Sequence, residues 1–305
     1  MNYTKINGII VNKLTVAQYK ELRENNSLNS TELYCFTDFD DFVSECYYIC
    51  NGLNDNVKIS NIVKAFLNEN ASDDKTMLLH IIGEVGVAAG AASGTGASNN
   101  AYKWFDFSAG TTTRRVELEF TSASRFIVSV PNATNNIIVF TGASEISIKG
   151  MQFSCDNVAS GTKVQAIKGT GVITFEDCRV WVRAYQDTII AERGTFNNCR
   201  FTARSAAGNG IVFSVTDYVI VNGGEHYAYT ANGTFGAVVY QATATAVTSL
   251  HAVRFPTKAI SGYTQTYAYK IDKGYFCAVA VISALTGSIA TAVTRNLIGH
   301  YSVSK

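Results

Sequence analysis

Proline and charge are both scarce in this chain of 305 residues, which has 2 prolines and 16% charged residues. An ordinary globular protein has about 25% charged residues. The net charge is +1 and no cluster of Lys and Arg stands out, which excludes a duplex nucleic-acid-binding face, because such binding needs concentrated positive charge. Together with 47% hydrophobic residues, the low charge indicates a chain that buries much of its surface, in part against copies of itself.

Export and membrane signals are also lacking. The opening MNYTKINGIIVNKLT has neither the basic start nor the long apolar run of a signal peptide. No stretch approaches the roughly 18 apolar residues of a membrane helix, so we expect no membrane insertion. The 7 cysteines form an odd set without an export signal, and we expect reduced thiols in the cytosol where the chain is made.

Two helices are predicted, both within the first 70 residues. Thr15 is expected to cap a helix in VAQYKELRENN, with Gln18 completing a capping box. In residues 57–70, Ile59, Ile62 and Val63 fall at helical spacing. We divide this part into an N-terminal module at 1–44 and a helical connector at 45–76.

From residue 77 to 261 the sequence repeats a plan of short apolar strands separated by turns. The residues that end each copy are Met151, Cys178, Cys199, Gly224 and Val253. The residue three positions earlier is apolar in every copy: Ile148, Phe175, Phe196, Val221 and Leu250. A period of roughly 20 to 30 residues is typical of a solenoid, and neither a Leu/Asn ladder nor helical periodicity is present. The predicted fold is mainly β, a parallel β-helix.

Two segments depart from the repeat. Residues 86–100 are rich in Gly, Ala and Ser and are followed by the strand-like YKWFDF, which favours a loop over a phosphate-binding turn that opens a helix. Residues 262–305 contain TQTYAYKI, a DKG turn and YFCAVAVIS, which predict an antiparallel hairpin. We interpret this segment as a C-terminal β cap over the open end of the solenoid.

Cys178 and Cys199 occupy equivalent positions in successive repeats, which favours a buried structural role over a disulfide or a metal site. A tetrahedral metal site needs four close ligands, and the nearest histidine on this plan, His226, lies one repeat later. Cys35, Cys46 and Cys50 have no histidine nearby in the sequence. We therefore predict no metal and no cofactor.

The acidic residues offer a catalytic alternative. Glycoside hydrolysis uses two carboxylates about 5 to 9.5 Å apart, and the candidates are Glu176, Asp177, Asp187 and Glu192. The alternative interpretation is that Glu176 and Asp177 have a structural role, at a tight corner between two strands. Equivalent corner pairs are Lys149-Gly150, Asn197-Asn198, Asn222-Gly223 and His251-Ala252, and Asn, Asp and Gly suit such turns.

Three further sets of residues are candidates for a functional site. Asp38, Asp40, Asp41 and Glu45 are expected to form a solvated turn, because the glycine and alternation of a calcium loop are absent. The histidines His80, His226, His251 and His300 do not group with a serine and an acid as a catalytic triad requires. The tyrosines Tyr263, Tyr267, Tyr269 and Tyr275 suit either a sugar-binding platform or packing between subunits in a tip.

The repeats GVITFEDCRV and GTFNNCRF resemble the right-handed parallel β-helix of the pectate-lyase type over residues 77–260. Leu14, Thr15, Gln18, Tyr19 and Leu22, followed by TELYCFTD at 31–38, resemble an N-terminal module on structural proteins of tailed bacteriophages. NDNVKISNIVKAFLNEN at 54–70 is similar to a helical piece in appendage proteins of crAss-like phages. The acidic and basic catalytic set of pectate-lyase-type enzymes does not map onto this chain, so that family's activity does not transfer.

These resemblances imply a non-enzymatic virion appendage, a head or tail fibre assembled in the host bacterial cytoplasm. Residues 1–70 would bind a capsid or tail protein, the β-helix would be the shaft of a homotrimer, and the distal surface would contact host glycans or proteins. Two alternatives are a tailspike-like depolymerase of host polysaccharide and a stand-alone carbohydrate-binding β-helix.

Overall fold

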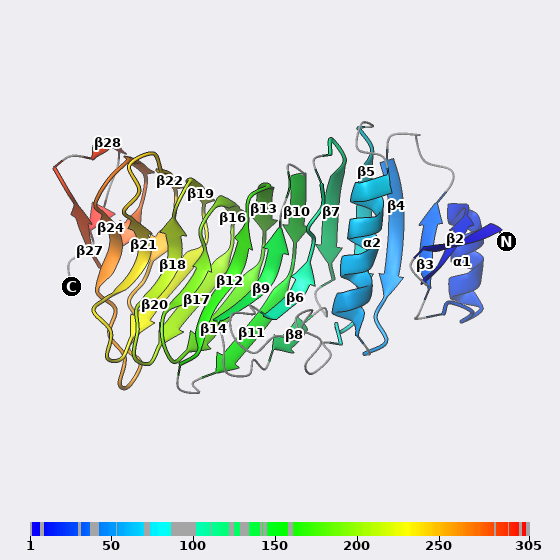
Figure 1. Ribbon diagram of the computed structural model, residues 1–305, viewed down its shortest axis with the longest axis horizontal. Coiled ribbons are helices and arrows are strands. Elements are labelled where there is room, and N and C mark those ends of the chain that lie inside the picture. The colour runs from blue at the N-terminus through cyan, green and yellow to red at the C-terminus, as the bar shows by residue number, and fades with distance from the viewer. Residues whose placement is uncertain are drawn as a thin grey trace.

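The protein is mainly β in this computed structural model, with two helices in the described part and strands along its whole length (Figure 1). The structure describes residues 2–6, 9–29, 32–36, 43–52, 54–69, 74–86, 102–110, 112–121, 125–128, 134–140, 142, 145–157, 161–283, 285–291, 293–298 and 301–302. Within these ranges, neither helix has the length and apolar character needed to cross a bilayer. The molecule is elongated, with the two chain ends at opposite ends of its long axis (Figure 1).

Three long sheets make up the body. Sheet A contains, in spatial order, β1 (Asn2–Ile6), β2 (Ile9–Leu14), β3 (Leu33–Phe36), β4 (Val43–Ile49), β5 (Thr76–Ile82), β7 (Arg115–Phe120), β10 (Glu145–Lys149), β13 (Val172–Glu176), β16 (Gly194–Asn197), β19 (Tyr218–Asn222), β22 (Val247–His251), β25 (Tyr275–Val279) and β28 (Thr294–Ile298). Sheet B contains β6 (Tyr102–Asp106), β9 (Thr134–Phe140), β12 (Lys163–Gly169), β15 (Thr188–Ala191), β18 (Gly210–Val215), β21 (Gly236–Gln241), β24 (Tyr267–Ile271) and β27 (Thr286–Ile289). Sheet C contains β8 (Arg125–Val128), β11 (Gln152–Asn157), β14 (Arg179–Ala184), β17 (Arg200–Ser205), β20 (Glu225–Thr230), β23 (Arg254–Phe255), β26 (Ile282–Ser283) and β29 (Tyr301–Ser302).

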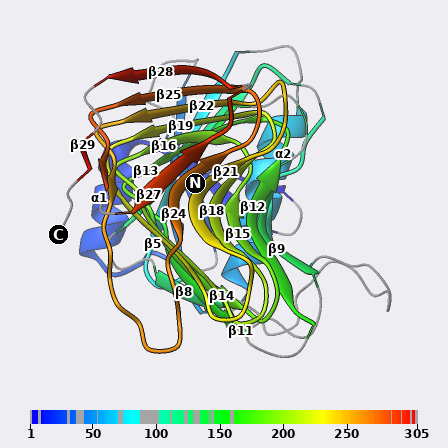
Figure 2. The same cartoon turned by 90° about the vertical axis from the view of Figure 1, so that its left-hand side faces the viewer.

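From β7 onward the chain visits sheets A, C and B in turn, and we call each such circuit a coil. Each strand from β10 to β29 pairs in parallel with the strand three elements earlier. Viewed along the long axis, the strands of each sheet lie one behind another (Figure 2). These long parallel sheets are compatible with a β-helix or other solenoid.

The register predicted from the repeats is confirmed. Ile148 pairs with Phe175, Phe175 with Phe196, and so on along one buried column of sheet A. The column consists of Leu118, Ile148, Phe175, Phe196, Val221, Leu250 and Ala278, each at most 1% exposed. The rings of Phe175 and Phe196 stack with centroids 5.7 Å apart. Because inward side chains alternate with outward ones along each strand, one apolar column per strand position builds a continuous core.

The corner between sheets A and C has the left-handed backbone expected of its residues. Its second residue has a positive φ in every coil from Gly150 to Ala280, with values between 50° and 72°. Side-chain amides also join successive corners, as Asn198 Nδ2 donates to Asp177 Oδ1 at 2.6 Å and Asn222 Nδ2 to Asn197 Oδ1 at 2.8 Å. Asn and Asp tolerate this conformation and add hydrogen bonds along the stack.

The antiparallel cap predicted for 262–305 is wrong. β24 pairs in parallel with β21 and β27, and β25 pairs in parallel with β22 and β28. The DKG turn at Asp272–Gly274 carries the chain from sheet B to sheet A, and Gly274 has φ +88°. The coils therefore continue to β29.

The N-terminal unit has a small core of its own, formed by Leu14, Tyr19 and Tyr34. Its helix α1 (Val16–Glu24) begins at the predicted cap: Thr15 N donates to Gln18 Oε1 at 2.8 Å, and Gln18 N to Thr15 Oγ1 at 3.2 Å. β4 pairs antiparallel with β3 and parallel with β5. Sheet A thus runs from this unit into the coils, and the predicted boundary at residues 44 and 45 falls inside β4.

The second helix, α2 (Asp55–Glu69), covers the first strand of sheet B. Ile59, Val63 and Leu67 are at most 1% exposed on its inner side, as the helical spacing predicted. Asn56 Nδ2 donates to the backbone oxygen of Trp104 at 2.7 Å, and Lys64 forms an ion pair with Asp106 at 2.8 Å. The helix therefore closes the core at the N-terminal end of the coils, where a solenoid otherwise exposes apolar surface.

Gly224 directly follows the left-handed corner residue Gly223, between sheets A and C, and has little room for a side chain. A Cβ at Gly224, whose φ is +85°, would lie 2.1 Å from the backbone oxygen of Cys199, whereas a Cβ at Gly223 would meet no atom closer than 3.9 Å. We expect Gly224→Ala to cost about 3 kcal/mol, the upper end of the range for backbone strain, and Gly223→Ala about 1 kcal/mol. Thermal unfolding of the two variants measures the difference, and equal melting temperatures would contradict the geometry.

Candidate functional site

The four carboxylates considered for hydrolysis lie at three different corners of the coil. Glu176 and Asp177 lie between β13 of sheet A and β14 of sheet C, Asp187 between β14 and β15, and Glu192 between β15 and β16. Because these corners join different pairs of sheets, the structure does not gather the four residues at one place (Figure 2).

The carboxylates of Glu176, Asp177 and Asp187 each contact a neighbouring residue of the fold. Glu176 lies 3.4 Å from Lys149 Nζ on the preceding coil, and Asp177 accepts the hydrogen bond from Asn198. Asp187 Oδ1 accepts from the backbone N–H of Asn209 at 2.8 Å. Glu192 instead lines a cavity of about 400 Å³. The contacts favour the structural reading of the corner residues over a catalytic pair.

The four tyrosines do not form one platform. Tyr269 is 5% exposed and packs on Phe276 inside the coil, with ring centroids 4.8 Å apart. Tyr275 is 53% exposed on sheet A, and Tyr267 belongs to sheet B. Tyr263 lies in the segment between β23 and β24 and interacts with Arg183 of sheet C. None of the four is among the residues that line the groove described below.

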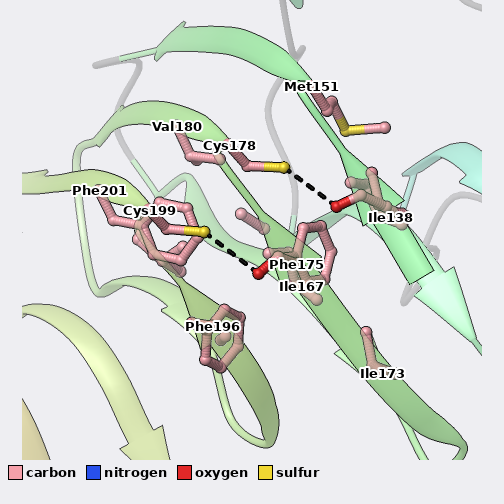
Figure 3. Packing of buried hydrophobic residues seen from close by; sticks show 14 of the residues in the cluster. Ile138, Met151, Ile167, Ile173, Phe175, Cys178, Val180, Phe196, Cys199 and Phe201 are labelled. Atoms are coloured by element: carbon pink, nitrogen blue, oxygen red, sulfur yellow. Dashed lines mark hydrogen bonds between the residues drawn. The ribbon is translucent and has the colours of Figure 1, made fainter. Parts of the chain in front are cut away.

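Cys178 and Cys199 are core residues, as the repeats indicated (Figure 3). Their thiols contact backbone oxygens, Cys178 Sγ that of Ile148 at 3.4 Å and Cys199 Sγ that of Phe175 at 3.5 Å. Burial raises the pKa of the Cys178 thiol well above its ordinary value, with Cys199 adding to the effect. A thiol held protonated in this way is a poor nucleophile and metal ligand.

In the N-terminal unit, Cys35 and Cys46 face each other across the antiparallel pair of β3 and β4, with their Sγ atoms 2.6 Å apart. All seven cysteines are free thiols. Within the residues that the structure describes, no three His, Cys, Asp or Glu side chains come together as a metal site.

The predicted acidic turn lies mostly outside the described residues, which exclude Asp38, Asp40 and Asp41, as they exclude His300. Its last member, Glu45, contacts His80 Nε2 at 2.8 Å, and His80 Nδ1 contacts Glu119 at 2.9 Å. The Tyr47 ring stacks on His80 with centroids 4.5 Å apart. Glu45 therefore helps to link the N-terminal unit to the first coils across β4, β5 and β7.

The most developed site is a groove on sheet C that the sequence analysis did not identify. It has a volume of about 400 Å³, within the range of small-molecule sites. The residues that line it come from β11, β14, β17, β20 and the segment between β23 and β24: Gln152, Phe153, Ser154, Arg179, Val180, Trp181, Arg200, Thr202, Arg204, Tyr227, Tyr229 and Lys258. We call this site the sheet C groove.

Register explains why these side chains meet. Trp181 pairs with Thr202, and Thr202 with Tyr227, so the three lie in one column across three coils. Neighbouring strands are about 4.8 Å apart, which leaves the small Thr202 between two aromatic residues. Arg204 belongs to the next column, beside Tyr229.

The segment after β23 forms one side of the groove. Thr264 N donates to Thr230 O at 2.8 Å and Thr230 N to Thr264 O at 3.0 Å, which fixes the segment against the end of β20. Lys258 of this segment is exposed and lines the groove. The segment appears as the orange loop at the lower edge of Figure 2.

The groove is rich in cation–aromatic contacts. The guanidinium carbon of Arg204 lies 5.2 Å from the Trp181 ring centroid and 5.6 Å from that of Tyr229, and Arg200 lies 5.7 Å from that of Tyr227. Four of the residues that line the groove are Arg or Lys, and none is Asp or Glu. The arrangement combines positive charge, aromatic surface and hydroxyl groups, which suits a polar ligand with apolar faces.

The sequence contained a signal for this groove, in the outward positions of the repeats. Arg179 and Arg200 immediately follow Cys178 and Cys199, and Trp181 and Thr202 follow two positions later. The repeat is defined by its inward positions, whereas the outward residues come together only when neighbouring coils stack. In comparisons with known proteins, no family model, no curated protein and no solved structure matches this chain.

Proposed function

We propose that this chain is a structural appendage of a bacteriophage particle, a head or tail fibre whose coils form a right-handed parallel β-helix. The observation that carries the proposal is the uninterrupted parallel pairing from β5 to β28 in sheet A. Every interior strand of such a stack is hydrogen-bonded to both neighbours, which gives a stiff rod. A stiff rod with a distinct unit at one end suits an attached fibre.

The N-terminal unit is the proposed anchor. Its small core of Leu14, Tyr19 and Tyr34 is separate from the main core, and its sequence resembles modules of phage structural proteins. In this proposal, residues 1–70 bind a capsid or tail protein and the coils project from the particle. The sheet C groove then lies on the flank of the shaft and contacts glycans of the host surface.

We include a homotrimer in the proposal, with the later strands of sheet A as its contact face. β7, β10 and β13 each contain charged residues, whereas β16, β19, β22 and β25 contain none. Val247 is 41% and Tyr275 53% exposed on this face. Depletion of charge and exposed aromatic and aliphatic side chains are typical of the centre of a protein interface.

The depolymerase alternative needs two carboxylates within reach of one sugar. Glu176, Asp187 and Glu192 lie at three different corners, and the residues that line the sheet C groove include no carboxylate. Glu192 shares its cavity with a second carboxylate, Asp217, but Asp217 forms an ion pair with Arg193 at 3.1 Å, so this cavity does not present two free carboxylates either. Release of new reducing ends from host polysaccharide, abolished by Glu176→Gln or Asp187→Asn, would reverse that judgement.

The proposal is tested on particles. Antibody against residues of the last coils, used in immunogold electron microscopy of purified phage, is expected to label projections from the head or tail. Native mass spectrometry of the isolated chain is expected to give three subunits, and Val247→Glu with Tyr275→Glu to give monomers. Absence of the chain from purified particles would overturn the appendage, and a monomeric wild-type chain would overturn the trimer.

A further inference from the structure

We propose that the sheet C groove binds an acidic saccharide, a sugar chain that carries carboxylate, sulfate or phosphate groups. The inference rests on the proposed function, because it names the ligand class of the same surface. Three features of the groove carry it: an excess of positive charge, a guanidinium held against two aromatic rings, and aromatic surface next to hydroxyl groups.

Three of the four cations that line the groove have no carboxylate partner in the part of the chain that the structure describes. Among the described residues, no carboxylate forms an ion pair with Arg179, Arg204 or Lys258. Of the two nearest acids on sheet C, Glu225 contacts Arg200 of the groove and Arg254 outside it, and Asp156 pairs with Arg183 outside it. Glu225 lies 4.0 Å from Arg200 and 3.7 Å from Arg254, and Asp156 accepts two hydrogen bonds from Arg183 at 2.6 and 3.0 Å. Grouped cations with no adjacent anion attract an anionic ligand.

Arg204 is held in place for such a ligand. Its guanidinium lies against both Trp181 and Tyr229, which restricts the side chain before any ligand arrives. Its Nε atom is buried and has no hydrogen-bond acceptor among the described residues. Because Nε is buried, an anionic ligand in the groove would meet the terminal amino groups of this guanidinium. Arginine binds carboxylate and phosphate groups with paired hydrogen bonds.

The other groups favour a saccharide over a simple anion. Trp181 is half-buried, so its ring offers apolar surface to one side of a sugar ring. Gln152, Ser154 and Thr202 add side-chain donors and acceptors for hydroxyl groups. A nucleic acid is disfavoured because the net charge of the chain is only +1.

The test uses full-length protein and matched sugars that differ only in charge. Binding of a hexamer of β-1,4-linked glucuronate and of cellohexaose, and of 3′-sialyllactose and lactose, is measured by titration calorimetry. We expect at least one acidic member to bind about tenfold or more tightly than its neutral partner, with affinity that falls as salt rises. Inorganic phosphate and sulfate are titrated in parallel.

Variants separate charge from stacking. Arg204→Gln is expected to weaken acidic binding about tenfold and leave neutral binding unchanged, and Trp181→Ala to weaken both. Lys258→Gln, on an exposed segment, repeats the charge test without touching the sheet, and Arg115→Gln on sheet A serves as the matched control with no effect.

Each outcome decides between the two proposals. Equal affinity for acidic and neutral sugars, with loss in Trp181→Ala, would overturn the acidic preference and leave glycan adhesion standing. Binding of inorganic phosphate as tight as that of the sugars would also overturn it, in favour of a plain anion site. No binding of any of these sugars would overturn both the ligand class and the role of the groove in adhesion.

Discussion

Acidification is expected to weaken the coils through one buried histidine, His226 of β20. Its side chain is fully buried among aromatic rings, with centroids of Phe213 at 5.1 Å and Phe201 at 5.4 Å. Neither ring nitrogen makes a hydrogen bond of good geometry among the described residues, and the backbone of Gly223 is the nearest polar partner that affects the ring. Burial lowers the pKa of His226 to about 3, and the backbone of Gly223 opposes only part of this shift. The ring is therefore neutral in the folded protein at any ordinary pH.

The sign of the pH effect follows from this lowered pKa. An unfolded histidine takes up a proton near pH 6.5, while folded His226 does so only near pH 3. Between these values the unfolded state binds one more proton, so the free energy of unfolding falls by about 1.4 kcal/mol per pH unit, about 5 kcal/mol in all. The contribution is intact above pH 6.5 and lost as the pH falls toward 3.

His226→Phe is expected to remove this dependence and to raise stability at neutral pH by about 1 to 2 kcal/mol, because it replaces two buried polar atoms that lack hydrogen bonds of good geometry. Phe fits the local pattern, since His226 pairs with Phe201 of the preceding strand. If the Phe ring is too large for the core at this position, His226→Leu is the alternative substitution. Thermal unfolding of wild type and variants from pH 3 to 7 measures the effect.

His251→Asn is the matched control. His251 lies at the corner of the next coil, partly exposed, and contacts Ser249 Oγ at 2.7 Å. Asn222 occupies the equivalent position one coil earlier, so the substitution fits the corner. Parallel pH profiles for wild type and His226→Phe would refute the role of the buried ring.

Two features of this fold were predictable from the sequence: the inward columns and the corner between sheets A and C. The inward columns were predictable because apolar residues recur at equivalent positions, from Ile148 to Leu250, and the pairing follows that recurrence. The corner was predictable because Asp177 and Asn198 belong to residue types that tolerate positive φ. Both features are local properties that repeat once per coil.

The last coils were mispredicted for a physical reason. A turn such as Asp272–Gly274 serves a hairpin as well as a corner between sheets, and the sequence of the turn does not choose between them. The choice depends on the preceding coil: Gln241 Nε2 donates to the backbone oxygens of Ala246 and Lys273 at 3.1 and 2.6 Å, and Gln241 O accepts from Asp272 N at 2.8 Å. These contacts exist only once the coils are stacked.

The sheet C groove was not predicted for the same reason: it forms only once the coils are stacked. Trp181, Arg204 and Tyr227 lie on three successive strands of sheet C, and their proximity depends on the register of those strands. The segment that carries Lys258 adds a contact that no repeat predicts. The proposed binding function therefore depends on outward positions, which vary from coil to coil, while the fold depends on inward ones.

The N-terminal closure is expected to fail when Asp55 is replaced. Asp55, at the start of α2, is fully buried, and its carboxylate accepts four hydrogen bonds. The donors are Tyr48 Oη at 2.8 Å and the backbone N–H groups of Asn51 at 3.2 Å, Gly52 at 2.9 Å and Gly86 at 2.8 Å. One side chain thus fastens β4, α2 and the chain beyond β5, which suits an acidic residue at a helix N-terminus. The same carboxylate and burial raise the pKa of Tyr48, with burial the larger cause.

Asp55→Ala leaves these donors without their acceptor and is expected to cost about 4 kcal/mol, within the range for breaking a buried charged network. Because each coil is hydrogen-bonded only to its neighbours, the loss is expected at this end of the molecule. Hydrogen exchange of the Gly52 and Gly86 amides is expected to accelerate about a hundredfold or more, while amides of β16 to β22 keep their protection. Glu24→Ala, an exposed acid on α1, is the matched control. Unchanged exchange at Gly52 and Gly86 in Asp55→Ala would show that the carboxylate does not hold α2 on the coils, and uniform loss of protection would show that the stack unfolds as one unit.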